Sequence, residues 1–421
     1  MPRRGVATAP YGVAGVPCRT RWRQGMFHVM GAWRLAVPLI LLLGPLPLLS
    51  QAADRPPTLE QLEANARRDS LDAEALYRLA YRYDILKRYD DAGRLARQAV
   101  TVDPRYAPAW LLLGYLPYDR RPRLWNDVAK RKLPPAWQDS VAESNRLLHR
   151  AFLVDPLVDF RVIGATPPKQ DIVAIPDYGD YTTIYLLELG VSQFGWRYEL
   201  SYNAIDLFIE RYYKGKPVDS IPSGLFWLRG LAAAHLRSYL KAIADIRVVL
   251  DRSLKHEASD SLIQLDLGTN DYRYLLALLM ERVHRPADAM ALYQEALAND
   301  LGLWMAHTRL ARLYAENTMW SQAIEEARRA VDANPEDPSL LVDLGELLRD
   351  AGRLDEAATT LRQAQEANGR IPRISYVLGL VEMQRSQPAL AKVALAQFVS
   401  IAPSRMSAEI ADAKQRLAAL P

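Results

Sequence analysis

Cysteine is almost absent from this chain of 421 residues, which contains only Cys18. A single cysteine excludes a disulfide within the chain and the zinc sites that need several thiolates. The six histidines offer no substitute, because none of them forms the H-E-x-x-H pair of a helical zinc site. The sequence therefore predicts no metal site.

Motifs for catalysis and nucleotide binding are also missing. The sequence has no G-x-S-x-G elbow, no Walker loop and no G-x-G-x-x-G fingerprint. The segment PDYGDY at 176–181 lacks the further oxygen ligands of a calcium loop, and it reads as a turn before a helix capped by Asp180. We predict no catalytic residue and no cofactor. An unrecognised enzyme stays an alternative, because catalytic groups need not be adjacent in sequence.

No long uninterrupted hydrophobic run is present. The apolar stretch 35–50 follows Arg34 and contains three prolines and a glycine, whereas a membrane span needs about 20 apolar residues. This pattern is typical of a secretory signal peptide, with Ser50 and Ala52 as the small residues before cleavage. We predict that residues 1–52 are a signal peptide, with Met26 or Met30 as alternative starts, and that the protein is periplasmic or otherwise exported. The alternative is an inner-membrane anchor through residues 35–50.

The excess of positive charge is confined to this leader. Residues 1–52 contain six arginines and no acidic residue, so the rest of the chain carries 47 basic and 49 acidic side chains. A nearly neutral chain gives no electrostatic reason to expect nucleic acid as a partner. We expect no integral membrane span after processing.

A repeat of 34 residues runs through the C-terminal part. Small or apolar residues recur in register over four units, where Pro335 and Pro403 each close a unit. A hairpin of two helices needs small residues where the helices approach and leucines along the seam, and one such hairpin must stack on others to bury its apolar face. The columns are Leu276, Leu310, Leu344 and Leu378; Ala277, Ala311, Gly345 and Gly379; Ala289, Ala323, Ala357 and Ala391; and Ala296, Ala330, Ala364 and Phe398.

These columns resemble the tetratricopeptide repeat family, whose consensus places Trp, Leu-Gly, Tyr, Ala, Phe, Ala and Pro over 34 residues. Residues 73–104 match it away from the C-terminal block, through Leu79, Ala80, Tyr83, Ala92, Ala99 and Pro104. A further unit fits 223–254. The resemblance implies an all-α, right-handed solenoid of stacked antiparallel helix pairs, with ligands on the concave face lined by the first helix of each pair.

The expected organisation divides the chain into six parts. The ends fit an array of hairpins, because Thr58 with Gln61 makes a capping box and residues 407–420 are amphipathic. The parts are a signal peptide (1–52), N-terminal repeats (53–156) with an insertion at 118–135, an irregular connector (157–180), divergent helix pairs (181–268), four C-terminal repeats (269–403) and a capping helix (404–421).

The insertion is basic. It suggests a docking loop for an anionic surface such as lipid headgroups, glycan or an acidic partner. The alternative is a solvated loop with one Trp packed against the solenoid. The residues of this basic docking loop are Arg120, Arg121, Arg123, Trp125, Lys130, Arg131 and Lys132.

Carrying the family's concave face over to this chain predicts a ligand groove that is aromatic in its N-terminal half and charged further on. Aromatic rows suit extended peptides or sugar rings, whereas the alternative is packing between hairpins, above all for Tyr81 and Trp227. The predicted groove residues are Tyr77, Tyr81, Tyr115, Trp227, Tyr274, Arg312, Arg349 and Tyr376.

The resemblance implies a protein or peptide partner, and with the leader it predicts a non-catalytic scaffold of the bacterial cell envelope. A carbohydrate-binding or polymer-guiding module in polysaccharide export is the alternative. Glycan binding would depend on Tyr77, Tyr115 and Tyr274, whereas protein binding would also need Arg312 or Arg349.

Overall fold

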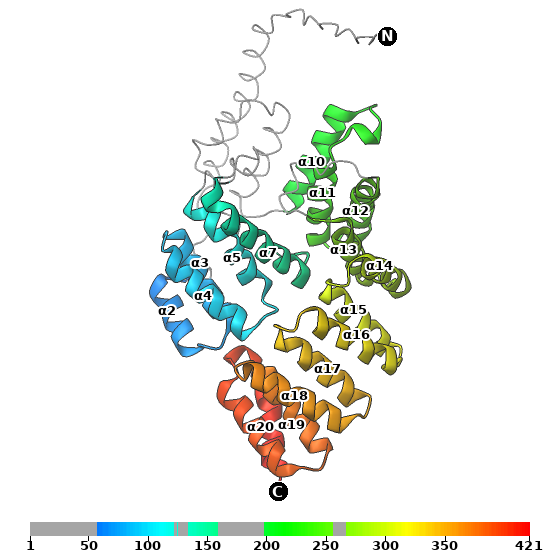
Figure 1. Cartoon of the computed structure of the whole chain (residues 1–421). Coiled ribbons are helices and arrows are strands. Elements are labelled where there is room, and N and C mark those ends of the chain that lie inside the picture. Colours follow the sequence, from blue (N-terminus) through cyan, green and yellow to red (C-terminus); the bar gives the residue numbers. More distant parts are fainter. Residues whose placement is uncertain (1–56, 122–123, 125–133, 159–197, 256–266) are drawn as a thin grey trace, which may run out of the picture. The chain divides into compact units, whose positions relative to one another are not determined.

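The computed structural model describes residues 57–121, 124, 134–158, 198–255 and 267–421 (Figure 1). Within these ranges the secondary structure is helical, and consecutive helices pair as antiparallel hairpins. The predicted all-α fold class of stacked helix pairs is confirmed. Residues 58–421 form one compact unit. The predicted signal peptide (1–52) and all but the first two residues of the connector predicted at 157–180 lie outside the described residues.

Hairpins of similar length follow one another along the chain, with short 3₁₀ turns between some of them. The pairs are α3–α4, α5–α7, α11–α12, α13–α14, α15–α16, α17–α18 and α19–α20. The helices are α2 (Leu59–Arg68), α3 (Ala73–Ile85), α4 (Tyr89–Val102), α5 (Ala107–Arg120), α7 (Gln138–Val154), α10 (Tyr198–Tyr213), α11 (Ser223–His235), α12 (Tyr239–Leu254), α13 (Thr269–Arg282), α14 (Pro286–Asn299), α15 (Trp304–Glu316), α16 (Trp320–Ala333), α17 (Pro338–Asp350), α18 (Leu354–Asn368), α19 (Pro372–Gln384), α20 (Pro388–Ile401) and α21 (Ser407–Ala419).

The small residues of the repeat lie where the two helices of a hairpin touch. A Cβ atom added at Gly345 would stand 2.7 Å from Leu361 Cγ, and one at Gly114 would stand 2.6 Å from Leu148 Cγ. A Cβ atom essentially never approaches another non-bonded heavy atom this closely. Glycine at these positions therefore allows the two helices of a hairpin to pack as closely as they do. The alanines of the neighbouring columns are buried with less than 2% of their surface exposed, for example Ala357.

In the six hairpins other than α5–α7, the turn uses one residue in the left-handed region. Gly352 has φ of +77° in the hairpin α17–α18. The other hairpins place residues with side chains at this point, among them Lys87 with φ of 60° and Thr318 with φ of 58°. This conformation costs such a residue roughly 1 kcal/mol relative to glycine, so the turn geometry is required by the packing rather than by local preference.

The capping box predicted at Thr58 is present, and Asp337 caps a second helix. Gln61 N–H donates to Thr58 Oγ1 at 3.2 Å and Thr58 N–H donates to Gln61 Oε1 at 2.9 Å, which completes the capping box of α2. Ser339 N–H donates to Asp337 Oδ1 at 3.0 Å at the start of α17. At the other end of the array, α21 packs on α20 and its Ala413 is fully buried.

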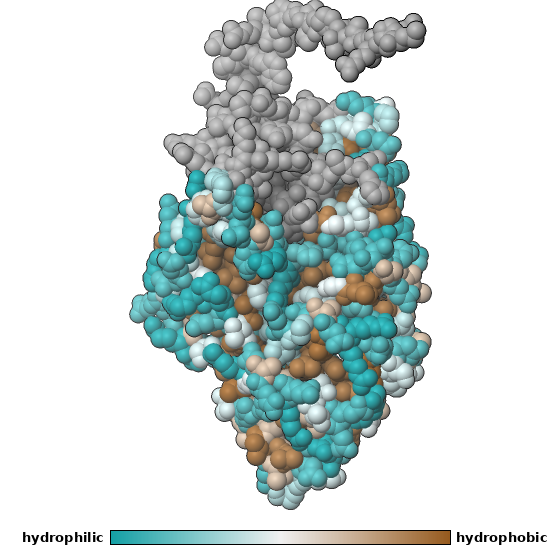
Figure 2. Space-filling model, in the orientation of Figure 1, coloured by the Kyte–Doolittle hydropathy of each residue, from teal (hydrophilic) through white to brown (hydrophobic). Residues whose placement is uncertain are grey.

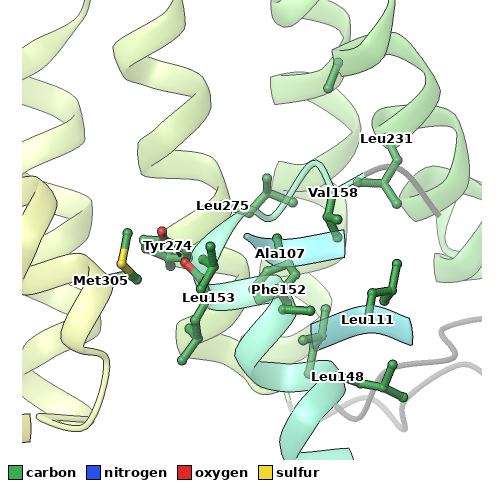
Figure 3. Packing of buried hydrophobic residues seen from close by; sticks show 14 of the residues in the cluster. Ala107, Leu111, Leu148, Phe152, Leu153, Val158, Leu231, Tyr274, Leu275 and Met305 are labelled. Carbon is green, nitrogen blue, oxygen red and sulfur yellow. Dashed lines mark hydrogen bonds between the residues drawn. The ribbon is translucent and has the colours of Figure 1, made fainter. Parts of the chain in front are cut away.

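The core runs through the seams and between neighbouring hairpins. Hydrophilic residues cover most of the described face in Figure 2, with hydrophobic residues in smaller patches between them. Helix α7 packs directly on α13, where Tyr274 lies between Leu153 and Met305 and donates a hydrogen bond of 2.8 Å to Leu153 O (Figure 3). Helix α13 also contacts α12, so it joins two parts of the array.

No helix in the described part of the chain is long and apolar enough to cross a membrane.

Pro117, which replaces the consensus Tyr, lies inside α5 without ending it. The unit expected at 223–254 coincides with α11 and α12.

Candidate functional site

The predicted groove residues belong to the first helices of the hairpins, and we call the side of these helices that carries them the helix A face. At its N-terminal end Tyr77 and Tyr81 of α3 are half-buried and stacked, with ring centroids 6.2 Å apart and planes at 17°. Tyr106 meets Tyr77 edge-on at 5.4 Å. These rings present partly exposed aromatic surface, which suits contact with a ligand.

Three other predicted groove aromatics lie in the core instead. The exposed fractions of Tyr115, Trp227 and Tyr274 are 2%, 4% and 0%. Trp227 packs edge-on against Tyr272, with the ring centroids 5.6 Å apart. The expectation that they line a ligand surface is corrected on this point, because closely stacked neighbouring hairpins leave no space beside these rings. Trp227 follows the packing alternative, and Tyr81 follows it in part, because it is half-buried and packs against the core.

The C-terminal end of the helix A face carries arginines. Arg312 is exposed and pairs with Glu316 at 2.9 Å, whereas Arg349 is mostly covered and pairs with Asp350 at 2.7 Å. A hollow of about 360 Å³ lies beside Arg349, lined by Arg349, Leu380, Met383, Gln384 and Arg416.

Tyr376 borders the same end of the face. Its hydroxyl donates to Asp412 Oδ2 of α21 at 2.8 Å, and its ring packs on Phe398. This tyrosine therefore holds the capping helix in place, and only part of its surface is available to a ligand.

Part of helix α17 is engaged by the chain itself. Arg105, in the turn between α4 and α5, donates from Nη1 to Asp343 Oδ1 at 3.0 Å and from Nε to Ser339 Oγ at 3.2 Å, both on α17. Arg373 pairs with Glu346 at 2.6 Å. These contacts engage Ser339, Asp343 and Glu346 of α17 within the chain.

Further polar contacts join the N-terminal hairpin α3–α4 to the C-terminal repeats. Arg405 Nε donates to Asp72 Oδ1 at 2.8 Å, and Asn368 Nδ2 donates to Thr101 O at 2.7 Å. The first hairpin and the last repeats are thus tied by polar contacts that salt and substitution can weaken.

The N-terminal end holds two carboxylates that the groove prediction omitted. Asp84 of α3 is buried, and Asp119 near the end of α5 is close enough to interact with it electrostatically. Burial raises the pKa of Asp84 to about 6, and burial together with the Asp84 charge raises the pKa of Asp119 to about 8. Both lie one helical turn beyond predicted groove tyrosines, Tyr81 and Tyr115, and that spacing is the signal that could have found them.

The basic docking loop is described only at its start. Arg120 pairs with Asp90 at 2.5 Å, and the Arg121 guanidinium lies 5.1 Å from the Trp137 ring centroid. The other predicted residues of the loop, Arg123, Trp125, Lys130, Arg131 and Lys132, lie outside the described residues, and the loop stays a prediction.

The described histidines that are buried or half-buried make internal contacts. His307 Nδ1 lies 2.6 Å from Glu326 Oε2, and His149 Nε2 lies 2.8 Å from Asp271 Oδ1. In the described ranges no three His, Cys, Asp or Glu side chains are grouped so that they could hold a metal ion.

Comparison with known proteins places these hairpins in a family. Two models described as tetratricopeptide repeat match the chain, one at residues 73–106 and the other in overlapping matches at 274–338, 308–370 and 342–403. A search of curated proteins found no match.

Solved structures resemble parts of the chain. A structure of MamA (AMB-1) is 17% identical, with 42% of this chain and 91% of that chain covered and a TM-score of 0.34. The C-terminal part of a TPR repeat-containing protein from Cytophaga hutchinsonii is 13% identical, with 48% and 74% covered and a TM-score of 0.40. Likeness at this level supports no statement about function. On these matches and the observed hairpins, the chain contains tetratricopeptide repeats at residues 73–106 and 274–403.

Proposed function

We propose that this protein is a non-catalytic scaffold of the bacterial cell envelope, which binds a partner protein or peptide on the two ends of its helix A face. The observation that supports this proposal best is that the face has half-buried, stacked Tyr77 and Tyr81 at one end and an arginine-lined hollow beside Arg349 at the other. Rigid aromatic rings and arginines are the side chains that contribute most to protein interfaces.

The stacked hairpins support this function because they present the side chains of the face on closely packed helices. Their seams are closely packed, and polar contacts such as that of Arg105 with Asp343 join the first hairpin to the later repeats. A surface that is ordered before binding loses less conformational entropy on association.

Export is part of the proposal, and the leader-like residues 1–52 support it. N-terminal sequencing of the protein purified from its native host tests this part. Cleavage after Ala52 leaves Ala53 as the first residue, whereas a chain that retains residues 35–50 in the membrane fraction contradicts processing.

Carbohydrate binding has less support than protein binding. It needs a row of accessible aromatic rings, but Tyr115 and Tyr274 are buried in the core. Only the stacked pair Tyr77 and Tyr81 remains partly exposed among the tyrosines at the N-terminal end. No described observation favours a glycan over a peptide.

Crosslinking capture of the tagged full chain from its native envelope fraction tests the binding function. We compare the wild type with a Tyr77→Ala, Tyr81→Ala variant, an Arg312→Ala, Arg349→Ala variant and the control Gln98→Ala, which changes an exposed residue of the second helix α4. A partner kept by the wild type and the control but lost in both face variants supports the proposal. A partner kept equally by all four chains contradicts it.

A further inference from the structure

An arginine of the chain itself occupies part of helix α17. Arg105, in the turn between α4 and α5, uses all three of its guanidinium nitrogens there. Its Nε donates to Ser339 Oγ at 3.2 Å, its Nη1 donates to Asp343 Oδ1 at 3.0 Å, and its Nη2 donates to Asp343 Oδ2 and to Ser339 O. Two bonds from one guanidinium to one carboxylate are the arrangement by which proteins recognise arginine.

Glu346 continues this site along α17. Ser339, Asp343 and Glu346 follow one another at spacings of four and three residues, which places them on one side of the helix. Arg349 follows three residues later, so this side belongs to the helix A face. Glu346 also accepts two bonds from one guanidinium, from Arg373 Nε at 2.9 Å and from Arg373 Nη2 at 2.6 Å. We call Ser339, Asp343 and Glu346 the acidic surface of α17.

The contacts that keep Arg105 on this surface are polar. Arg405 Nε donates to Asp72 Oδ1 at 2.8 Å, and Asn368 Nδ2 donates to Thr101 O at 2.7 Å. The side chain of Arg405 is 45% exposed, so its ion pair is open to solvent. We call the contacts of Arg105, Asn368 and Arg405 with these partners the clasp, which joins the first hairpins to the C-terminal repeats.

A second contact between the same regions is apolar. Tyr274 of α13 is fully buried and meets Phe152 of α7 edge-on, with the ring centroids 6.3 Å apart, and Leu153 lies beside it (Figure 3). Apolar burial does not depend on attraction between charges, whereas partly exposed ion pairs are weak and are screened by salt. The clasp can therefore open while α7 and α13 stay packed together.

We propose that Arg105 is an internal occupant of the acidic surface of α17, and that an arginine side chain of the partner replaces it when the clasp opens. The inference rests on the proposed function and specifies one side chain of the partner together with its site. Arg105 itself supports it, because a guanidinium already reaches Ser339 and Asp343. The clasp is then an autoinhibitory contact, since closed chains withhold this surface and the apparent affinity for a partner falls with the fraction of open chains.

Calorimetric titration of the full chain with a blocked Ala-Arg-Ala tripeptide tests the site. The same peptide with citrulline in place of arginine is the uncharged control. The Arg105→Ala variant should bind the arginine peptide at least about tenfold more tightly than the wild type, because the internal guanidinium no longer competes. The citrulline peptide should bind neither chain. Adding Asp343→Asn to the Arg105→Ala variant should lower the affinity at least about tenfold.

Two matched controls separate the site from general effects of charge. Arg97→Ala removes an exposed arginine of α4, and Asp332→Asn neutralises an exposed aspartate of α16. Neither should change binding, and circular dichroism verifies that each variant keeps its helical content. Equal affinity of the wild type and the Arg105→Ala variant, no effect of Asp343→Asn, or equal binding of the two peptides contradicts the inference.

Electron–electron resonance distances test whether the clasp opens. Spin labels are attached to cysteines placed at the exposed positions Gln98 of α4 and Glu366 of α18, in a chain with Cys18→Ser. We expect one short distance at low salt, and a longer one in about 1 M NaCl or in the Arg105→Ala, Arg405→Ala variant. The salt measurement leaves the clasp residues unchanged, so it does not depend on a variant. The same distance under all three conditions contradicts the clasp.

Crosslinking capture from the native envelope fraction separates this inference from the proposed function. The Arg105→Ala variant should capture more of the partner than the wild type or the Arg97→Ala control. A partner captured equally by all three chains overturns this inference alone. Capture of nothing but a second copy of the chain would mean that the partner assignment is wrong. Peptide binding as expected, without any captured protein, overturns the proposed function.

Discussion

The first hairpins, α3 to α7, and the C-terminal repeats, α13 to α20, share one backbone design and differ in the chemistry of their helix A face. Glycine meets leucine across the seam in both regions, at Gly114 with Leu148 and at Gly345 with Leu361. The face is acidic and aromatic at the N-terminal end, whereas arginines line the C-terminal hollow. Seam and face therefore vary independently, so one array presents two chemically different surfaces.

Replacing an aromatic residue in the core and one on the face should separate these two roles most strongly. Tyr274→Ala removes a fully buried ring and its hydrogen bond to Leu153 O, and we expect a loss of about 3–5 kcal/mol in the free energy of unfolding. Tyr77→Ala removes a half-buried ring and should cost less. Urea unfolding followed by circular dichroism measures both. Equal losses would mean that Tyr77 is also a core residue.

The shared seam can be tested at its glycine. Gly345→Ala places a Cβ atom 2.7 Å from Leu361 Cγ, so we expect a loss of about 1–3 kcal/mol in the free energy of unfolding. Gly114→Ala should behave alike in the first hairpins because the contact with Leu148 is as short.

A second background serves as the control for this steric explanation. In a chain that already carries Leu361→Ala, the added methyl group at position 345 meets open space and should cost little. A loss that persists in this background would contradict close packing as the cause.

The two regions should also respond differently to pH. Because the pKa values of Asp84 and Asp119 are raised to about 6 and about 8, the folded chain binds their protons more tightly than the unfolded chain does. Their contribution to stability is complete below about pH 4 and is lost as the pH rises to about 8, by on the order of 3 kcal/mol from the buried Asp84 alone.

Urea unfolding across this pH range, for the wild type and for the Asp84→Asn, Asp119→Asn variant, isolates the effect. The difference between the two chains should grow in favour of the variant as the pH rises. A constant difference would show that neither carboxyl has a raised pKa.

The smallest expected effect is at the turn inside the hairpin. Gly352→Thr should lower the free energy of unfolding by about 1 kcal/mol, because φ at this position is +77°. Thr318→Gly, at the same repeat position, should raise it by less than about 1 kcal/mol, since the relief of strain is partly offset by a more flexible unfolded chain. Thermal unfolding of both variants gives the comparison, and a shift of the same sign in both would contradict it.

The fold was predictable because its determinants recur. Columns such as Leu344, Gly345 and Ala357 repeat every 34 residues, and each meets the same packing requirement in every hairpin. The cap of α17 at Asp337 was also predictable from the sequence, because a helix cap depends only on residues that are neighbours in the chain.

The candidate site was less predictable, because exposure depends on contacts between hairpins. Tyr77 and Tyr274 occupy comparable positions in their first helices, yet only Tyr274 is enclosed, by α7 and α14. The contact of Arg105 with Asp343 joins residues 238 positions apart, which no local pattern indicates. The positions of Asp84 and Asp119 could have been predicted from the sequence, because helical spacing places them beside the groove tyrosines Tyr81 and Tyr115.

Site-specific photocrosslinking tests the central claim most directly. A photoreactive amino acid is placed at Tyr81 and at Leu380 on the two ends of the helix A face, and at the exposed Gln98 on a second helix. The account predicts that the same envelope protein is crosslinked from Tyr81 and Leu380 and is not crosslinked from Gln98. Crosslinking from Gln98 with none from Tyr81 and Leu380 would contradict it.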